Sequence, residues 1–387
     1  MSDPDIPIPA TARVKLDRAA LVGNWSALDR LSGKAKAGAA VKANAYGLGV
    51  RDVVSCLLAA GCEDFFVANW QEAREIEDLT AGRAAVSVLN GVQKADMPFA
   101  SRSPAKPVLN SLEQVQRWLP TARPCDLMIN SGMNRLGINV ADLQPDILTG
   151  LTIDIGMSHL ASADEDGPQN IGQLACYKAA LEILPVCRTS LANSAGIALG
   201  EDYHFDVTRP GLSLYGGIQR SELEKVVRQV AALQAEIIQV RTLAVADKVG
   251  YNAQYIADRP HPIAILAIGY ADGYLRGFSG RGIFRHGDAK LPVLGRVSMD
   301  MVAIDLSHAP DLSEGDWVDC VYDLPTASAQ SGLSQYELIT GLRRRTMKNC
   351  CAKTLHNKRS CGDAQIGLVQ SQHKIFMVGL TEQQQNL

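Results

Sequence analysis

Short apolar runs alternate with helical segments over the first 215 residues of the chain. The candidate strands are residues 38–43, 65–69, 86–90, 107–109, 126–130, 151–157, 188–193 and 212–215. Helical periodicity lies between them, as in the spacing of Leu21, Trp25, Leu28 and Leu31. Parallel strands need crossover connections of this length, so eight repeats of strand and helix predict a (β/α)8 TIM-type barrel. A doubly wound open sheet is the alternative.

The pattern changes near residue 227, where helical periodicity gives way to short β-rich runs. These runs are residues 235–240, 262–268, 293–297, 302–306 and 317–322, and glycine and aspartate separate them. We therefore predict a barrel domain at residues 12–226 and a mostly β C-terminal domain at residues 227–342. Residues 343–387 differ from both, and their basic start and glutamine-rich end predict a solvated, partly disordered tail.

Composition narrows the class of protein without naming a function. The chain has 387 residues, 47% apolar and 20% charged, with a net charge of −3, so nucleic acid and anionic membranes are not expected as partners. No apolar run is long enough to span a bilayer and no secretion signal is recognisable, which predicts a cytoplasmic protein. The 9 cysteines form no C-x-x-C pair and the 7 histidines no H-x-x-x-H pair, so no metal site is expected.

Polar residues follow the predicted strands, at the edge where a barrel enzyme builds its active site. Lys42 is the most informative of them because it follows an apolar run and is flanked by small residues. Partial desolvation would lower the pKa of such a lysine and favour a nucleophilic amine. Taken by itself, this pattern is more often that of an ordinary surface or edge lysine.

Residues 40–49, AVKANAYGLG, resemble the attachment signature for pyridoxal 5'-phosphate (PLP) in alanine racemases. Further matches follow in the same order as in that family. They are NSGMNRLG at 130–137, SLANSAG at 190–196, RPGLSLYG at 209–216, VGY at 249–251, IGYADG at 268–273 and GRVSMD at 295–300. The resemblance runs from Ala12 to Leu342, so it covers both predicted domains.

The resemblance implies a fold type III, PLP-dependent enzyme that interconverts L-alanine and D-alanine with two bases. Lys42 would bind the cofactor and act on the D-isomer, and Tyr251 would act on the L-isomer from the opposite face. The cofactor-binding residues implied are Lys42, Tyr46, His159, Ser194, Arg209, Gly211 and Leu212. The substrate-binding residues implied are Arg135, Met299, Tyr270 and Asp300.

The family resemblance also implies a homodimer, because Tyr251 and Met299 reach the active site of the partner subunit. D-alanine for peptidoglycan, or alanine catabolism, is the implied role. The alternatives are a racemase that accepts other small amino acids, an amino-acid decarboxylase of the same two-domain plan, and a non-catalytic PLP carrier. An inactive relative is a further alternative because of the atypical C-terminus.

Two features depart from the family pattern. Met128 and Asn130 stand where many relatives have a lysine, often carbamylated, and an aspartate, which leaves open what orients Arg135; a bound anion beside Asn130 is one hypothesis. The family ending is also missing after Leu342. A shifted reading frame in the source gene is a hypothesis that the other two frames of the nucleotide sequence would test.

Overall fold

A ring of parallel strands forms the first half of the computed structural model, which describes residues 10–342 and 347–350. Seven strands pair in the order β3, β4, β5, β6, β7, β9 and β10, and every pairing is parallel. The bounds are β3 Ala39–Ala40, β4 Asp64–Val67, β5 Ala85–Val88, β6 Lys106–Leu109, β7 Pro124–Asn130, β9 Thr152–Met157 and β10 Arg188–Ser190. The short strand β8, Ile138–Asn139, pairs with β7 outside this order.

The ring closes through β11, Val207–Thr208. This strand pairs in parallel with β2, Lys36–Ala37, which leads directly into β3. On its other side a parallel bridge joins Asn193 to Arg209, and the backbone N–H of Asp206 donates to the carbonyl of Thr189 in β10. The prediction of a (β/α)8 barrel is confirmed.

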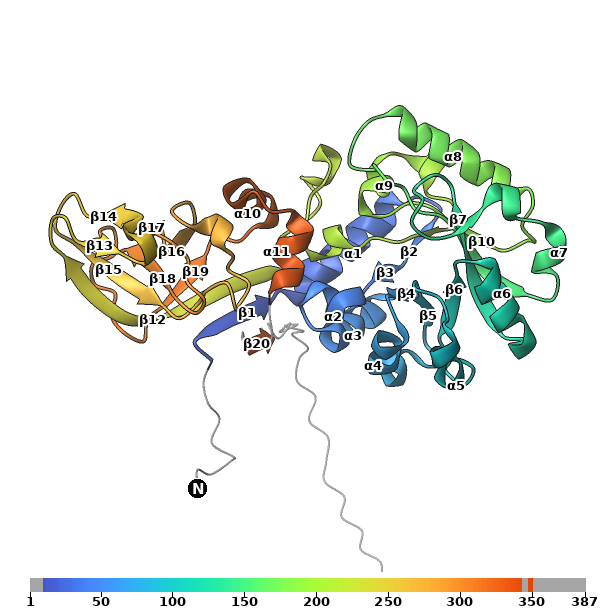
Figure 1. Cartoon of the computed structure of the whole chain (residues 1–387), viewed down its shortest axis with the longest axis horizontal. Helices are drawn as coiled ribbons and strands as arrows, with labels where there is room; N and C mark the ends of the chain where they lie inside the picture. Colours follow the sequence, from blue (N-terminus) through green and yellow to red (C-terminus); the bar gives the residue numbers. More distant parts are fainter. Residues whose placement is uncertain (1–9, 343–346, 351–387) are drawn as a thin grey trace, which may run out of the picture. The chain divides into compact units, whose positions relative to one another are not determined.

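Helices connect consecutive strands and lie around the outside of the ring (Figure 1). They are α1 Arg18–Leu31, α3 Val50–Ala60, α4 Trp70–Thr80, α5 Met97–Ala100, α6 Leu112–Trp118, α7 Pro145–Leu148, α8 Pro168–Leu181 and α9 Ser194–Ala198. Short 3-10 turns accompany them at η1 Lys94–Asp96, η2 Leu119–Thr121, η3 Val140–Asp142, η4 Glu201–Tyr203, η5 Leu212–Tyr215 and η6 Ser221–Leu223. The helices of residues 10–342 are all too short or too polar to cross a membrane.

Two of the predicted strands need correction. Residues 212–215 form the 3-10 turn η5 rather than the eighth strand, and that place in the ring belongs to β11. The four side chains of η5 are buried, so their apolar pattern reflects burial in the core and not strand geometry. The first predicted strand ends at Ala40, and the short helix α2, Lys42–Tyr46, begins two residues later.

The second half of the chain is a closed antiparallel β-barrel built around the long strand β12, Ala231–Leu243. From β12 the pairing runs through β15, β18, β17, β16 and β19 and returns to β12. The bounds are β15 His261–Leu266, β16 Ile283–His286, β17 Ala289–Leu294, β18 Val302–Asp305 and β19 Trp317–Cys320. The hairpin of β13, Lys248–Val249, and β14, Tyr255–Ile256, the turns η7 Tyr251–Ala253 and η8 Arg276–Phe278, and the helices α10 Leu324–Ser331 and α11 Gln335–Gly341 complete this half.

The N-terminal strand β1, Ala12–Leu16, belongs to this β-sheet and not to the parallel barrel. It pairs antiparallel with β12 and parallel with β20, Met347–Cys350. A strand within the predicted tail was not expected. The remainder of that tail, 343–346 and 351–387, lies outside the described residues.

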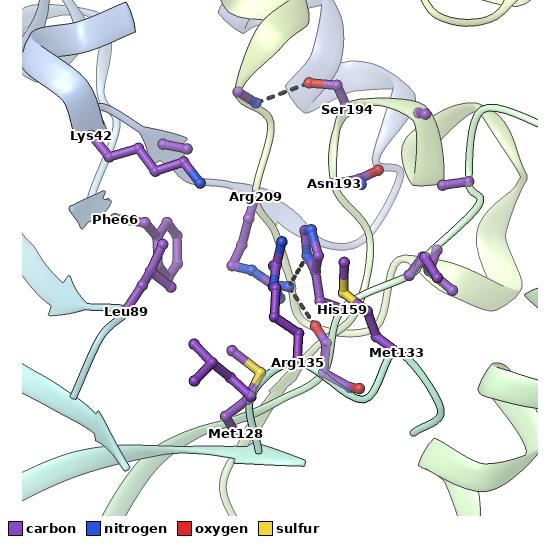
Figure 2. Close-up of a pocket in the computed structure, with 18 of the residues that line it drawn as sticks. Lys42, Phe66, Leu89, Met128, Met133, Arg135, His159, Asn193, Ser194 and Arg209 are labelled. Carbon is purple, nitrogen blue, oxygen red and sulfur yellow. Dashed lines mark hydrogen bonds between the residues drawn. The ribbon is translucent and has the colours of Figure 1, made fainter. Parts of the chain in front are cut away.

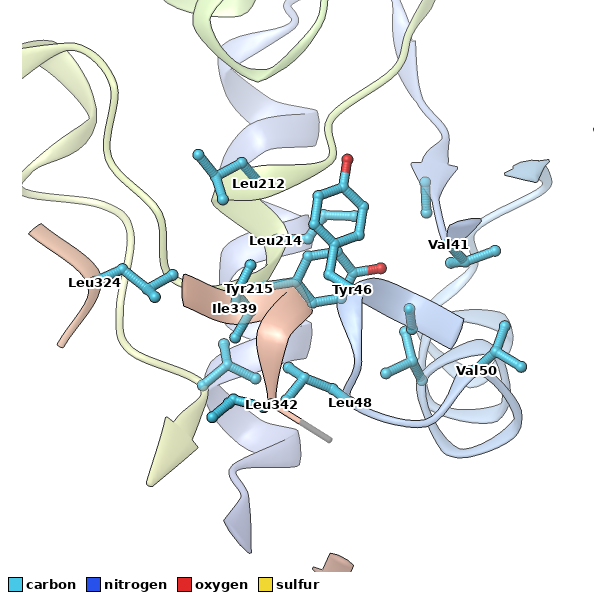
Figure 3. Packing of buried hydrophobic residues seen from close by; sticks show 14 of the residues in the cluster. Val41, Tyr46, Leu48, Val50, Leu212, Leu214, Tyr215, Leu324, Ile339 and Leu342 are labelled. Carbon is cyan, nitrogen blue, oxygen red and sulfur yellow. The ribbon is translucent and has the colours of Figure 1, made fainter. Parts of the chain in front are cut away.

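Helix α11 packs against the segment of α2 that carries Tyr46 and against the following Leu48 (Figure 3). Ile339 and Leu342 belong to the same buried cluster as Tyr46, Leu48 and Tyr215. Gly47 follows α2 directly, has a φ of +88° and faces α11. A Cβ at this position would lie 3.0 Å from the carbonyl oxygen of Ile339. Only glycine therefore allows both this backbone angle and this close approach.

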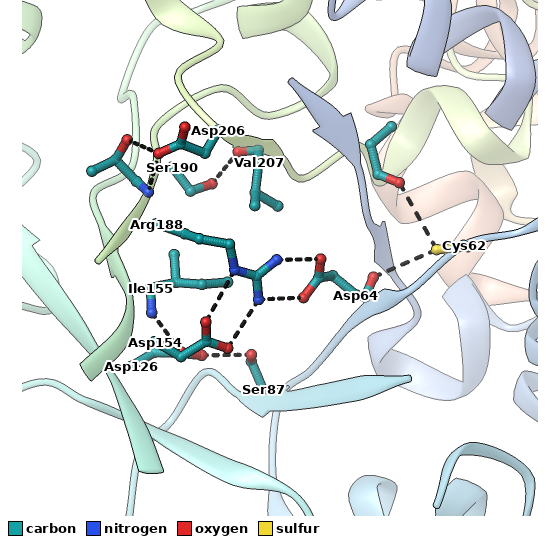
Figure 4. Close-up of polar contacts among 12 residues, drawn as sticks. Cys62, Asp64, Ser87, Asp126, Asp154, Ile155, Arg188, Ser190, Asp206 and Val207 are labelled. Atoms are coloured by element: carbon teal, nitrogen blue, oxygen red, sulfur yellow. Dashed lines mark hydrogen bonds and ion pairs between the residues drawn. The ribbon is translucent and has the colours of Figure 1, made fainter. Parts of the chain in front are cut away.

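The opposite end of the parallel barrel holds a network of charged side chains (Figure 4). Arg188 forms ion pairs with Asp64 at 2.8 Å and Asp154 at 2.9 Å. Lys106 pairs with Asp126 at 2.9 Å and also with Asp154. Burial alone would raise the pKa of Asp154, but hydrogen bonds and charges from Arg188 and Lys106 outweigh burial and lower the pKa from 3.8 to about 2.

This network predicts a pH-dependent loss of stability in the variant Asp154→Asn. A depressed carboxyl pKa stabilises the fold above the ordinary value of 3.8, and this contribution disappears as the pH falls towards about 2. Because Asp154 is partly exposed, solvent weakens its interactions, and we expect Asp154→Asn to lower the free energy of unfolding by about 1–2 kcal/mol at pH 7. The loss should become progressively smaller below pH 4. Urea unfolding at several pH values measures this, with the exposed Asp288→Asn as control. Equal losses at pH 7 and pH 3 would contradict the assignment.

Candidate active site

A cavity of about 680 Å³ lies where the parallel strands end (Figure 2). Seven of the predicted site residues line it, and they come from the segments that follow five different strands, β3, β7, β9, β10 and β11. They are Lys42, Tyr46, Arg135, His159, Ser194, Arg209 and Gly211. Leu212 is buried directly behind Gly211 and is not part of the lining. Residues as far apart in the sequence as Lys42 and Gly211 thus meet around a single cavity.

Lys42 begins a turn of unusual backbone geometry. The next four residues, Ala43 to Tyr46, have φ angles between 52° and 55°, so α2 is a left-handed turn made without glycine. Such a conformation costs about 1–2 kcal/mol for each residue, and surrounding contacts must offset that cost. The turn places the Lys42 amine towards the cavity (Figure 2). Burial, followed by the positive charges of Arg135 and Arg209, lowers the pKa of this amine, although Glu72 opposes the effect.

Arg209 and His159 lie next to each other in the lining of the cavity. The Arg209 guanidinium donates to Ser190 Oγ, to the carbonyl of Ser158 and, at 3.5 Å, to His159 Nδ1. Burial lowers the pKa of Arg209 to about 10, which still leaves it charged at neutral pH. Burial and the neighbouring cations lower the pKa of His159 to about 3, so its imidazole is neutral. No ion pair to Arg209 occurs among the residues that the structure describes.

A small cradle lies beside Lys42, between the Tyr46 hydroxyl and the start of η5. Ser194 Oγ accepts hydrogen bonds from the backbone N–H groups of Gly211 at 2.9 Å and Ser213 at 3.2 Å. A Cβ on Gly211 would lie 2.4 Å from the Tyr46 hydroxyl oxygen, so a larger residue would displace that hydroxyl. Burial raises the pKa of Tyr46 well above its usual value, which keeps the hydroxyl protonated and able to donate.

Asn130 organises the loop that carries Arg135. Its Oδ1 accepts from the backbone N–H groups of Gly132 at 3.1 Å and Asn134 at 3.0 Å, and its Nδ2 donates to Asn139 Oδ1 at 2.9 Å. Met128 is buried and lines the cavity, where it provides only apolar contact. The fold of this loop therefore places Arg135 at the cavity without a lysine at position 128.

The predicted site residues of the β domain lie away from this cavity within a single chain. Tyr251, Tyr270, Met299 and Asp300 are absent from its lining. The loops that carry Tyr270 and Met299 are close neighbours, because the Ala271 N–H donates to the Met299 carbonyl at 3.0 Å. Tyr251 and Met299 are 65% and 52% exposed, which is unusual for large apolar side chains. Their placement in the cavity of a partner subunit remains a prediction.

Three polar side chains of the lining, those of Asp164, Gln219 and Tyr336, lie on segments that the sequence did not connect with the site. Tyr336 lies on α11 and donates from its hydroxyl to Gln219 Oε1 at 3.3 Å, and both residues line the cavity together with Asp164. Asp164 follows His159 closely in sequence, which was a usable signal. Nothing in the sequence places Tyr336 beside the barrel, because only packing of α11 brings it there.

The composition of the cavity fits PLP, which combines a flat aromatic ring with a phosphate. Lys42, Arg135 and Arg209 place three positive charges in the lining, and Asp164 is the carboxylate found there. The cradle at Gly211 offers hydroxyl and backbone donors and has no room for a Cβ. An anionic group would offset the cost of burying Lys42 and Arg209 and would also be attracted by the exposed Arg135. A ring acceptor could also bind the Arg209 guanidinium.

Comparisons with known proteins agree for both halves of the chain. Residues 16–219 match the alanine racemase N-terminal domain, and residues 230–350 match the alanine racemase C-terminal domain.

An alanine racemase of Rhodospirillum rubrum is 39% identical over 354 residues, which cover 87% of this chain and 95% of that protein. A catabolic alanine racemase of Agrobacterium fabrum is 36% identical over 353 residues, covering 87% and 91% of the two chains. The crystal structure of alanine racemase from Bartonella henselae with covalently bound pyridoxal phosphate is 32% identical, with a TM-score of 0.82 over 88% of this chain and 100% of that one. The chain therefore belongs to the alanine racemase family.

Proposed function

We propose that this chain is a PLP-dependent racemase that interconverts L-alanine and D-alanine, with Lys42 and Tyr251 as its two bases. The relatives that it matches over most of its length are named alanine racemases, and the Bartonella henselae relative holds covalently bound pyridoxal phosphate. The observation that carries the residue assignment is the partly desolvated Lys42 amine, which shares a cavity with Arg135 and Arg209. A lowered lysine pKa favours the neutral amine needed for attachment to a carbonyl group and for proton transfer.

PLP, when bound, acidifies the Cα–H of an attached amino acid by withdrawing the electron pair that the proton leaves behind. Lys42 would attach to the cofactor. The Tyr46 and Ser194 hydroxyls and the N–H groups at Gly211 and Leu212 would hold its phosphate. Arg209 would donate a hydrogen bond to the ring nitrogen, and because arginine keeps its proton, that nitrogen would stay largely unprotonated. His159 would pack as a neutral imidazole against the ring.

Racemisation needs one base on each face of the substrate Cα. Once substrate is bound, the freed Lys42 amine would remove the proton from the D-isomer or return it. Tyr251 of the partner subunit would do the same for the L-isomer. Arg135 and the Met299 N–H would bind the substrate carboxylate, while Tyr270 and Asp300 would line the entrance. The exposure of Tyr251 and Met299 supports this arrangement, because a homodimer would cover both side chains.

Small amino acids other than alanine remain an alternative substrate class, and they would use the same bases. The reaction itself serves either peptidoglycan supply or alanine catabolism. Biosynthetic and catabolic alanine racemases of Agrobacterium fabrum are each 36% identical to this chain. A cytoplasmic location is the expected setting for either role.

Lys42→Ala is expected to abolish both cofactor attachment and racemisation. The absorbance near 420 nm that marks PLP bound to a lysine would be lost, because Lys42 is the one lysine among the described residues that line the cavity. Spectroscopy together with a coupled assay of D-alanine formation measures both. A persistent 420 nm band in a folded Lys42→Ala protein would contradict the assignment.

Tyr251→Phe is expected to retain the 420 nm band while racemisation falls by roughly 10²- to 10⁴-fold, the usual contribution of an acid–base residue. The proton on the L-face would lose its acceptor, so the Cα-deuterium isotope effect should increase when L-alanine is the substrate. Tyr255→Phe, a phenol on the same hairpin, is the matched control for loss of a hydroxyl. Full activity of Tyr251→Phe in both directions would refute the two-base mechanism.

Co-expression of Lys42→Ala and Tyr251→Phe tests whether two subunits share each site. A mixed dimer would contain one site with both bases intact, so random pairing of two inactive variants should restore about a quarter of the wild-type activity. Each variant expressed by itself is the control. If the mixture stays as inactive as its components, Tyr251 does not complete the partner's site.

A further inference from the structure

Glu72 lies on α4, outside the lining of the cavity, yet its carboxylate contacts the turn that carries Lys42. Its Oε1 accepts a hydrogen bond from the backbone N–H of Ala43 at 2.8 Å. Its Oε2 accepts from the backbone N–H of Ala68 at 2.7 Å. The two bonds join the ends of β3 and β4, which are adjacent strands of the barrel. One side chain thus ties the Lys42 turn to the neighbouring strand and helix.

Helix capping accounts for only one of these bonds. Glu72 is the third residue of α4, after the N-cap Asn69, whose Oδ1 accepts from the Glu72 N–H. A carboxylate at this position commonly binds an N–H at its own helix terminus and interacts favourably with the helix dipole. The bond to Ala68 is of this local kind. The bond to Ala43 spans 29 residues and contributes nothing to the cap of α4.

The left-handed turn needs such an external contact. The other hydrogen bonds of its backbone join residues close in sequence. Examples are Ala45 N–H to the Val41 carbonyl and Val50 N–H to Asn44 Oδ1, both at 2.8 Å. Ala43 is the first left-handed residue and directly follows Lys42. A shift of the Ala43 peptide would therefore redirect the Lys42 side chain, whose amine must stay aligned with the reacting Cα.

Charge gives Glu72 a second effect on the same lysine. Burial and the guanidinium groups of Arg135 and Arg209 lower the pKa of Lys42, and the negative charge of Glu72 opposes them. Arg135 approaches from the loop after β7, Arg209 from the segment after β11, and His159, which stays neutral, from the loop after β9. Removal of the Glu72 charge should therefore lower the pKa of Lys42 further.

We propose that Glu72 is a positioning residue for Lys42, because its carboxylate fixes the left-handed turn at Ala43 and thereby the direction of the lysine amine. This role rests on the proposed assignment of Lys42 as the cofactor lysine and the base for D-alanine. Glu72 itself touches neither cofactor nor substrate.

Glu72→Gln tests the role with little change in side-chain size, since it keeps one acceptor oxygen and removes the charge. Attachment of PLP to the apoenzyme, followed near 420 nm over a range of pH, should move to lower pH, because more of the Lys42 amine is neutral at a given pH. Racemisation should fall about ten-fold, as expected for loss of one charge-assisted hydrogen bond. The kinetic isotope effect on racemisation of D-[2-²H]alanine should increase, because proton removal by Lys42 becomes slower.

Glu75→Gln is the matched control, since Glu75 lies on the same helix, is exposed, and interacts with Arg51 through its backbone carbonyl and its charge rather than with the Lys42 turn. We expect it to match the wild type in all three measurements. If Glu72→Gln also matches the wild type, or if it loses stability with an unchanged pH profile and isotope effect, the positioning role is wrong. Retention of the 420 nm band in Lys42→Ala would instead refute the assignment of Lys42 itself, so the two failures are distinguishable.

Discussion

The site depends on positive charge at one end of the parallel barrel that forms no ion pair with any residue the structure describes. Lys42, Arg135 and Arg209 line one cavity, and burial lowers the pKa values of both Lys42 and Arg209. Cations removed from water are costly unless an anion accompanies them. A cofactor that carries a phosphate, and a substrate that carries a carboxylate, meet this requirement. Burial, together with these neighbouring positive charges, keeps His159 neutral, so His159 adds no positive charge to the cavity.

The two ends of the barrel handle charge in opposite ways. At one end Arg188 and Lys106 are paired with Asp64, Asp126 and Asp154, so their charges are balanced within the fold. At the other end the hydrogen-bond partners of Arg209 within the described part of the chain are neutral: a serine hydroxyl, backbone carbonyls and an imidazole. Paired charges contribute to stability, whereas unpaired ones remain available to a ligand. The N-terminal ends of the strands therefore carry charges that stabilise the fold, and the C-terminal ends carry the candidate active site, as in barrel enzymes generally.

The resemblance identified most of the cavity because its motifs fall at strand ends. Lys42, His159, Ser194 and Arg209 each follow a barrel strand, so their convergence follows from the parallel order of the strands. The hydrophobic pattern was less reliable for telling a strand from a turn where every side chain of a segment is buried. Residues 212–215 are apolar because η5 is buried, and a short buried turn has the same composition as a short buried strand.

Local periodicity and ordered motifs in the sequence predicted the barrel, the change to a β domain and the residue types of the site. Tertiary structure alone decided which distant segments meet. It paired β1 with β12, brought Tyr336 to the cavity through α11, and connected Glu72 to the Ala43 N–H. It also left Tyr251 outside the cavity of its own chain. These contacts depend on how whole elements pack against each other. The pattern of residues along the sequence shows which side chains an element carries, but it does not show which other elements lie beside it.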